Sequence, residues 1–166
     1  MEKVTVFLSL GSNINPREIH INKTLACLSE SLGNFRVSAI YESKPLYVTD
    51  QPLFLNCIAQ GDCTSSPEQL LDCIKNIEQK TGRTATFRNG PRVIDIDILL
   101  FGSACVNRPD LVIPHPEMAK RQFVLIPLVE LAPELRHPGT HRLFSEILSE
   151  IEPQGVYFHS VSRYTV

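Results

Sequence analysis

The chain has 166 residues and a mass of 18.6 kDa, a length that suits one domain with its own hydrophobic core. Hydrophobic residues make up 43% of the chain and charged residues 20%, which excludes a disordered protein, a collagen and a coiled coil. The net charge is −2 and no apolar run approaches the ~20 residues of a membrane helix, so we expect neither nucleic acid nor a membrane as a partner.

The first part of the chain predicts a strand, a helix and a second strand. Residues 4–10 are apolar and partly β-branched, as in a buried strand, and they lack the cleavage site of a signal peptide. The segment 15–18, Asn-Pro-Arg-Glu, predicts a helix start capped by Asn15. Apolar residues follow at helical spacing, and Gly33 is expected to end this helix. Residues 35–41 are predicted to form the second strand.

The middle of the chain repeats this order. Residues 54–61 predict a strand with Phe54, Asn56 and Ile58 on one face. The segment 66–69, Ser-Pro-Glu-Gln, is typical of a helix start with a capping box, and Gly82 is expected to end that helix. A further strand is expected over 94–101. The resulting order, βαββαβ, predicts an α+β fold with a ferredoxin-like core, an antiparallel sheet and helices on one face.

The last part of the chain predicts additional C-terminal helices, over 122–131 and 143–151, and an edge strand over 156–161. We find no repeat or linker, so residues 1–166 are expected to form a single domain. The five cysteines match neither a zinc site nor a disulfide framework, which favours reduced thiols in a cytoplasmic protein. A chain of this size is expected to work as a monomer.

Two aspartates alternate with apolar residues in the predicted strand 94–101, whose isoleucines and Leu100 are expected to face the core. Asp95 and Asp97 then share the opposite face, about 6.6 Å apart along the strand. Like charges on one strand face repel each other, and a divalent cation between them removes that conflict. The pair therefore predicts a Mg²⁺ site, because Mg²⁺ prefers a few carboxylate oxygens together with water and phosphate. A solvated strand face is the alternative.

A basic segment precedes the aspartates. Positive charges stand at Lys80, Arg83, Arg88 and Arg92, and no acidic residue lies between 79 and 94. Guanidinium groups bind phosphate oxygens through paired hydrogen bonds, so this charge beside a carboxylate pair predicts a polyphosphate site. The stretch 81–93 is almost devoid of apolar residues and contains Gly90-Pro91, which is typical of a loop that covers a nucleotide. An ordinary surface loop is the alternative.

Segment 88–99, Arg-Asn-Gly-Pro-Arg-Val-Ile-Asp-Ile-Asp-Ile-Leu, resembles the signature of the 6-hydroxymethyl-7,8-dihydropterin pyrophosphokinase family of folate biosynthesis. Further stretches match in the same order: Leu-Gly-Ser-Asn at 10–13, Pro-Leu at 45–46, Asp-Gln-Pro at 50–52, Phe-Leu-Asn at 54–56, Pro-His-Pro at 114–116, Arg121, Phe-Val-Leu at 123–125, Pro-Leu at 127–128 and Leu-Ala-Pro-Glu at 131–134. The resemblance covers most of the chain, from about residue 7 to residue 134. No single piece is specific, but the ordered set is.

The resemblance implies a reaction and its participants. Family members move the terminal pyrophosphate of ATP onto the hydroxymethyl group of the pterin, which gives AMP and the pterin diphosphate. Two Mg²⁺ ions normally take part, and ATP is the co-substrate. The pterin oxygen attacks the β-phosphorus in line, so catalysis would consist mostly of positioning and charge neutralisation.

The resemblance also implies roles for single residues. Asp95 and Asp97 match the metal ligands, in agreement with the strand geometry. Positions that contact the triphosphate match Arg83, Arg92 and Arg121, and His115 matches a position near the phosphates. Pterin-binding positions match Ser43, Leu46, Phe54, Asn56 and Phe123. We expect Arg83, Arg92, Asp95 and Asp97 to be catalytic, and Arg88 to join the ATP site. The alternatives are a structural turn for His115 and core packing for the two phenylalanines.

The sequence departs from the family pattern at a few positions of the basic segment and of the pterin site. Many members carry tryptophan where this chain has Asn89, and a second arginine where it has Ala85. The loop is also slightly short. Phe54 stands where tyrosine is commoner. These changes leave the metal site intact and bear on how tightly the loop closes.

Two other functions compete with the pyrophosphokinase. A phosphotransferase or nucleotidyltransferase acting on another small alcohol would keep the metal and the nucleotide, because a carboxylate pair does not identify the acceptor. A binding module of the same fold class, such as an RNA-recognition domain, would need exposed aromatic residues on its central strands. Two aspartates on that face would repel RNA phosphates, so we disfavour this alternative.

Overall fold

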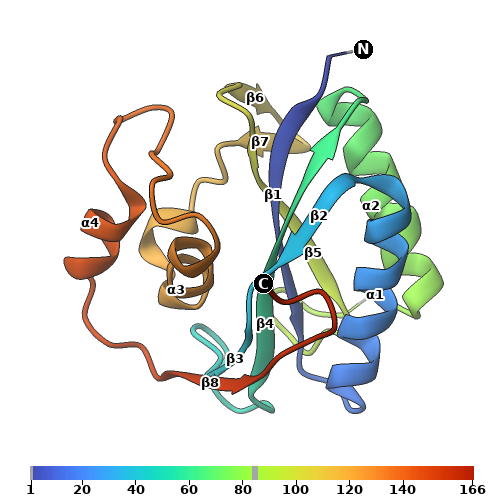
Figure 1. Cartoon of the computed structure of the whole chain (residues 1–166). Helices are drawn as coiled ribbons and strands as arrows, with labels where there is room; N and C mark the ends of the chain where they lie inside the picture. The colour runs from blue at the N-terminus through green and yellow to red at the C-terminus, as the bar shows by residue number, and fades with distance from the viewer. Residues whose placement is uncertain (1, 84–85) are drawn as a thin grey trace.

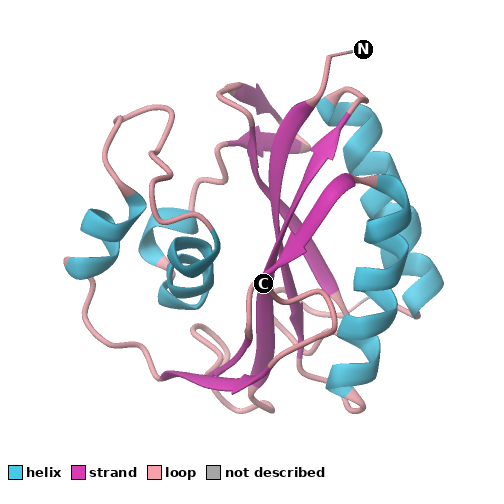
Figure 2. Cartoon of the chain, viewed as in Figure 1, coloured by secondary structure: helices cyan, strands magenta, loops and turns pink. Residues whose placement is uncertain are grey.

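The computed structural model describes residues 2–83 and 86–166, and its elements form helical layers on both faces of one sheet (Figure 1, Figure 2). In chain order the elements are β1 (Val4–Ser12), α1 (Arg17–Ser31), β2 (Gly33–Val37), β3 (Ile40–Ser43), β4 (Phe54–Cys63), α2 (Pro67–Thr81), β5 (Asp95–Phe101), β6 (Val106–Arg108), β7 (Leu111–Ile113), the 3₁₀ helix η1 (Met118–Lys120), α3 (Gln122–Leu131), α4 (Phe144–Ser149) and β8 (Val156–Ser160).

The main sheet confirms the predicted fold class. It has six strands in the order β5-β1-β4-β3-β8, with β2 also paired to β4, and every pairing between these strands is antiparallel. Helices α1 and α2 cover one face, whereas the C-terminal α3 and α4 lie on the opposite face (Figure 1). The βαββαβ core therefore keeps its helices on one face, as predicted, and the C-terminal extension adds a third layer.

Each face of the sheet has its own hydrophobic core. Leu55, Cys57 and Ala59 of β4 pack with α1 and α2, and Ile58 of the same strand packs with α3 and α4. This alternation follows from the two-residue period of a strand, and it was predicted for residues 54–61. The same period directs Phe54 and Asn56 to the face that α3 covers only in part.

Helix α2 begins and ends as its sequence predicts. The Ser66 hydroxyl accepts a hydrogen bond from the backbone of Gln69, and the Gln69 side chain accepts one from the backbone of Ser66. At the other end Gly82 has φ of 100°, the left-handed conformation that favours glycine. These ends fix where the basic segment leaves the helix.

Helix α1 differs from its prediction at both ends. Pro16, in an extended conformation, is the N-cap in place of the predicted Asn15, and its carbonyl accepts the backbone N–H of His20. The helix stops before Gly33, because Leu32 is already extended and turns its buried side chain onto Gly61 of β4. Gly33 begins β2 and caps nothing.

The predicted strand 35–41 is two strands, β2 and β3, separated at Ser38 and Ala39. The Ser38 hydroxyl accepts the backbone N–H of Ile58 at 2.9 Å, and the backbone N–H of Ala39 leaves the ladder for the carboxylate of Glu130 on α3. Side chains thus replace ladder bonds at this point, and the strand changes direction there.

Strand β5 starts at Asp95, one residue later than predicted, and contains an irregularity near its end. Phe7 pairs with Leu100 and Leu8 pairs with Ile98, so Leu99 is an extra residue in the β1–β5 ladder. The extra residue changes the phase of the alternation. Leu100 therefore packs with α3 and α4, and the prediction that it faces the same core as Ile98 is wrong.

The C-terminal elements agree with their predictions to different degrees. Helix α3 has the predicted bounds, and β8 is an edge strand paired with β3. Helix α4 is shorter than 143–151 because Leu143 is its extended N-cap and Glu150 its C-cap. The small β6–β7 hairpin was not predicted. All five cysteines are free, as expected, and no helix among the described residues could cross a membrane.

Candidate active site

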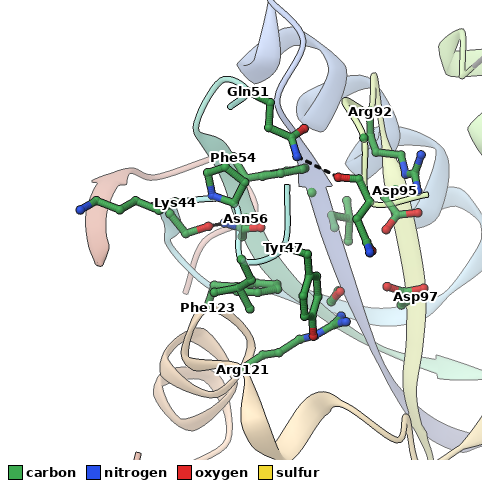
Figure 3. A pocket seen from close by; sticks show the side chains of 18 residues that line it. Lys44, Tyr47, Gln51, Phe54, Asn56, Arg92, Asp95, Asp97, Arg121 and Phe123 are labelled. Atoms are coloured by element: carbon green, nitrogen blue, oxygen red, sulfur yellow. Dashed lines mark hydrogen bonds between the residues drawn. The ribbon is translucent and has the colours of Figure 1, made fainter. Parts of the chain in front are cut away.

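A pocket lies on the α3 side of the sheet, where β1, β4 and β5 meet the loops that follow β3 and precede β5 (Figure 3). It is lined by Ser9, Leu10, Gly11, Ser43, Lys44, Pro45, Leu46, Tyr47, Gln51, Phe54, Asn56, Asn89, Gly90, Arg92, Asp95, Asp97, Arg121 and Phe123. The pocket therefore brings together the predicted metal ligands, two of the predicted phosphate-binding arginines and all the predicted pterin-binding residues.

Asp95 and Asp97 both line this pocket, as their alternation in the strand predicts (Figure 3). They stand opposite Gly11 and Ser9 of β1, so β1 presents only small residues beneath the carboxylates. Burial, followed by the charge of Asp95, raises the pKa of Asp97 to about 7. The raised pKa favours a protonated Asp97 in the absence of a cation.

A buried carboxylate that the sequence analysis missed supports this pair. Glu78 of α2 accepts the backbone N–H of Ile96 at 3.0 Å, between the two aspartates, and it forms an ion pair with Arg83. Arg83 also reaches Asp95 at 3.3 Å. Burial raises the pKa of Glu78. The sequence did contain a signal for this residue. Glu78 stands four positions after Ile74 on the apolar face of α2, where a charged side chain is expected only if it has a buried partner.

Positive charge faces the aspartates from two sides of the pocket (Figure 3). Arg92 comes from the segment before β5, and Arg121 caps the start of α3. The buried Nε of Arg121 has no hydrogen-bond partner among the described residues, and its guanidinium lies 5.8 Å from the centre of the Phe123 ring. An unpaired guanidinium donor beside two carboxylates suits an anionic ligand that bridges them.

His115 lies near this charge but does not line the pocket. Its backbone N–H bonds the carbonyl of Leu99, and its Nδ1 accepts the backbone N–H of Glu117 at 3.2 Å. Burial and then Arg121 lower its pKa, which favours the neutral ring. With Nδ1 as an acceptor, the ring proton is on Nε2, and this nitrogen is the donor that the side chain can offer.

The aromatic side of the pocket consists of Phe54 from β4 and Phe123 from α3. Figure 3 shows Asn56 between these two rings, and the aspartates on the other side of the pocket. The buried Asn56 amide donates to the Ser43 hydroxyl at 2.7 Å, which holds the amide in one orientation. Two apolar rings with an oriented amide between them suit a flat heterocycle with polar edges.

The basic segment also contains one predicted ATP-site residue outside the pocket and two departures from the family pattern. Arg88 is exposed and does not line the pocket, so its role stays a prediction. Ala85, one of the departures from the family pattern, lies outside the described residues. The other departure, Asn89, does line the pocket and has φ of 59°, a conformation that asparagine tolerates better than most side chains.

The donor set fits a hard divalent cation. Asp95 and Asp97 offer carboxylate oxygens at one place, and the raised pKa of Asp97 reflects burial and then repulsion from Asp95, which such a cation would offset. Among the described residues no group of three or more histidine, cysteine, aspartate or glutamate side chains gathers. The remaining ligand positions would therefore belong to water and phosphate, as Mg²⁺ prefers.

Comparison with known proteins places the chain among pterin-related proteins. Residues 7–133 match the family model described as 7,8-dihydro-6-hydroxymethylpterin-pyrophosphokinase. The 2-amino-4-hydroxy-6-hydroxymethyldihydropteridine pyrophosphokinase of Pseudomonas aeruginosa is 43% identical over 155 residues, which cover 91% of this chain and 94% of that protein. The folic acid synthesis protein fol1 of Schizosaccharomyces pombe is 40% identical over 93% of this chain, but this chain spans only 21% of that protein's length.

The fold has solved counterparts. The structure of wild-type HPPK-DHPS from Plasmodium falciparum with pteroate aligns with a TM-score of 0.73 and 17% identity, over 90% of this chain and 42% of that one. This likeness supports the arrangement of layers and strands.

Proposed function

This chain belongs to the 7,8-dihydro-6-hydroxymethylpterin-pyrophosphokinase family, and we propose that it transfers the pyrophosphoryl group of ATP to 6-hydroxymethyl-7,8-dihydropterin in folate biosynthesis. The products are AMP and the pterin diphosphate. One observation carries the proposal for the site: the carboxylate pair and the aromatic pair line a single pocket, with arginines beside them. A phosphate donor and a flat acceptor can therefore meet there.

The phosphate half of the site is assigned to charged residues. Asp95 and Asp97 would hold two Mg²⁺ ions, which supply charge neutralisation and orient the triphosphate oxygens when bound. Arg92 and Arg121 bind phosphate oxygens from the two sides of the pocket, and His115 offers its Nε2 proton to another. Arg83 is paired with Glu78 and lies near Asp95. From there it would balance the negative charge that develops on the phosphates during transfer.

The pterin half of the site is assigned to the aromatic side of the pocket. Phe54 and Phe123 contact the faces of the ring, and the Asn56 amide reads its edge. Ser43 fixes the amide, and Leu46 closes the pocket from the loop that follows β3. The remaining hydrogen-bonding groups of this buried amide would be left unpaired by a ring without matching donors and acceptors. The site should therefore discriminate strongly against such rings.

The chemical step exchanges one bond to the β-phosphorus for another. The hydroxymethyl oxygen of the pterin forms a bond to the β-phosphorus and releases its proton to water, while the bond from that phosphorus to the α–β bridging oxygen breaks. AMP leaves with the bonding electron pair on its phosphate oxygen. Because this transfer asks for little covalent work, the chain contributes by holding both substrates in line and by balancing the charge on the phosphates.

The remaining properties follow from size and composition. We expect residues 1–166 to act as one pyrophosphokinase domain, as a monomer and in the cytoplasm, where free cysteines stay reduced. Light scattering during size-exclusion chromatography would test the monomer, since the expected mass is 18.6 kDa.

The product spectrum tests the proposal. The protein would be incubated with ATP, Mg²⁺ and 6-hydroxymethyl-7,8-dihydropterin, and the products read by phosphorus NMR. AMP together with a pterin diphosphate is the expected result. ADP with a pterin monophosphate would mean transfer of a single phosphoryl group, and turnover with a different alcohol but none with the pterin would mean another acceptor. Either outcome would overturn the proposed reaction.

A further inference from the structure

Helix α3 begins at an arginine whose side chain cannot cap it. Arg121 is the N-cap residue, and its side chain makes no hydrogen bond to the first turn. A guanidinium has only donors, so it cannot accept the free N–H groups there, and the positive end of the helix dipole repels it. The side chain lines the pocket instead (Figure 3). The arginine at this position is therefore explained by the pocket and not by the helix.

A glutamine from the C-terminal segment bonds the start of α3 in its place. The Oε1 of Gln154 accepts the backbone N–H of Gln122 at 2.9 Å, and its Nε2 donates to the carbonyl of Lys120 at 3.0 Å. In return, the Gln122 side chain accepts the backbone N–H of Gln154 at 2.8 Å. These bonds hold the residues directly before and after Arg121, so they fix the backbone from which its side chain extends.

The same glutamine is joined to the main sheet. Gly155 follows it with φ of 74°, a left-handed turn that favours glycine. The next residue, Val156, begins β8 and pairs with Ser43 at the end of β3. Gln154 therefore ties the start of α3 to the edge of the sheet whose strand β5 carries the two aspartates.

Few other contacts fix the Arg121 side chain. Its buried Nε has no hydrogen-bond partner among the described residues, and its guanidinium lies 5.8 Å from the centre of the Phe123 ring. Phe123 belongs to the first turn of the same helix and moves with it, so this contact cannot fix the guanidinium relative to the sheet. The distance from the guanidinium to the aspartates therefore depends on where the backbone of residues 120–122 is held.

We propose that Gln154 is a positioning residue that holds the Arg121 guanidinium on the phosphate side of the pocket. This inference rests on the proposed function, because it takes the ligand of Arg121 to be the nucleotide phosphates. A guanidinium held in place binds a phosphate oxygen with a smaller loss of conformational freedom, so removal of these bonds weakens nucleotide binding. The effect passes through Arg121, since Gln154 does not line the pocket.

Calorimetric titration of the whole chain with Mg²⁺ and α,β-methylene ATP, whose α–β bridge cannot be cleaved, tests this dependence. Gln154→Ala removes both bonds of the amide and should lower the affinity about fivefold or more. In an Arg121→Ala background the same change should alter the affinity by less than about twofold, because the residue through which it acts is gone.

Gln122→Met serves the same test with less risk to folding. Methionine suits a helix, and this change removes only the acceptor for the Gln154 backbone N–H. We expect a smaller loss of nucleotide affinity, which should likewise disappear in the Arg121→Ala background.

Gln69→Ala is the matched control. The Gln69 side chain caps α2 by accepting the backbone N–H of Ser66, and it does not line the pocket. Its loss should lower the melting temperature and leave the nucleotide affinity within about twofold of the wild type. An unchanged affinity in Gln154→Ala, or an equal loss with and without Arg121, would overturn the inference and leave the proposed reaction intact. A wild-type protein that binds no nucleotide would overturn the proposed function, and this inference with it.

Discussion

Asp97 holds a proton at a pH where an exposed aspartate would be ionised. Burial and the neighbouring Asp95 raise its pKa from 3.8 to about 7. Between these values the folded chain binds more protons at this residue than the unfolded chain does, so its contribution to the free energy of unfolding falls as the pH rises. Above neutral pH and without a bound cation, the ionised Asp97 therefore lowers the free energy of unfolding.

Metal binding should show the same titration. A cation displaces the proton of Asp97, so affinity for Mn²⁺ alone, followed by loss of the free-ion electron paramagnetic resonance signal, should rise about tenfold per pH unit up to about pH 7 and then level off. Using the metal without nucleotide keeps the titration of ATP phosphates out of the measurement. Affinity that is flat between about pH 5 and about pH 7 would contradict this assignment.

Asp97→Asn separates the two effects of this side chain. The variant should lose about a hundredfold or more of the turnover and most of the metal affinity, because one of the two carboxylates is gone. At about pH 8 and without metal, it should melt a few degrees above the wild type, since the buried like-charge repulsion is removed. A simple folding defect would lower the melting temperature instead.

Glu78 is expected to matter to the reaction although it lies beneath the pocket. In Glu78→Gln the side-chain oxygen can still accept the N–H of Ile96 and a hydrogen bond from Arg83, but the negative charge that pairs with Arg83 is lost, so Arg83 pairs more closely with Asp95. We expect kcat to fall about tenfold and the KM for ATP to rise by less, in steady-state assays.

Glu68→Gln is the control for Glu78 on the same helix. Its ion pair with Arg108 is half-exposed on both sides, and such pairs contribute little. Its kinetics should stay within about twofold of the wild type. Equal losses in both variants would mean that Glu78 acts only through the stability of α2.

The residues of the site were predictable to the extent that they stand in strands or in ordered motifs. Alternation alone placed Asp95 and Asp97 on one face, and it placed Phe54 with Asn56. Glu78 escaped prediction because its partners, an edge N–H of β5 and Arg83, are brought to it only by the packing of α2 against the sheet.

At the scale of elements, the contact between Leu32 and Gly61 controls how α1 joins β2. A Cβ added at Gly61 would lie 2.7 Å from the Leu32 Cβ and 3.2 Å from the Gly33 carbonyl. Neither neighbour can withdraw easily, since Leu32 is buried and the carbonyl is backbone. Gly61→Ala should therefore lower the free energy of unfolding by about 1–3 kcal/mol in urea titrations.

Gly33→Ala provides the comparison on the adjacent strand. The nearest atom to an added Cβ there is the Asp62 Cβ at 3.7 Å, an ordinary contact, and Gly33 does not have a positive φ. We expect a change within about 1 kcal/mol, in the stabilising direction, because alanine restricts the unfolded chain. Equal destabilisation in both variants would contradict the packing explanation.

Elements with strong local signals were predicted well. The capping box and left-handed glycine of α2 set both of its ends, and the apolar run of α3 set its length. The errors arose where a residue distant in sequence changed a hydrogen bond or a strand pairing. Glu130 draws the N–H of Ala39 out of the ladder, and Leu99 is displaced by the pairing of β5 with β1. Such long-range competition leaves no mark in a short window of sequence.

On the scale of the whole molecule, the site lies where the third layer joins the sheet. Figure 1 shows α3 beside the sheet on the side opposite α1 and α2. This helix brings Arg121 and Phe123 to the pocket, whereas the sheet contributes Asp95, Asp97 and Phe54. The distance between the two halves of the site is therefore set by how α3 docks on β3 and β4.

Tyr41 of β3 anchors that docking through Glu130 of α3. The phenol donates to one carboxylate oxygen of Glu130, and the other oxygen accepts the N–H of Ala39 at 3.0 Å. Burial, then the Glu130 carboxylate, raises the pKa of Tyr41 above its usual range, so the phenol keeps its proton and remains a donor at all working pH values.

Tyr41→Phe should lower the free energy of unfolding by about 1 kcal/mol or more and raise the KM for the pterin several-fold, with a smaller effect on ATP. The effect on the pterin is expected because Phe123 is on α3. The effect on ATP is expected to be smaller because, of the pocket residues assigned to the phosphates and metal, only Arg121 is at the start of α3, whereas Asp95, Asp97 and Arg92 come from the sheet side. Tyr157→Phe, on the neighbouring β8 where the side chain is 67% exposed, should change neither quantity. If Tyr41→Phe loses stability but keeps the wild-type pterin KM, the placement of α3 does not govern pterin binding.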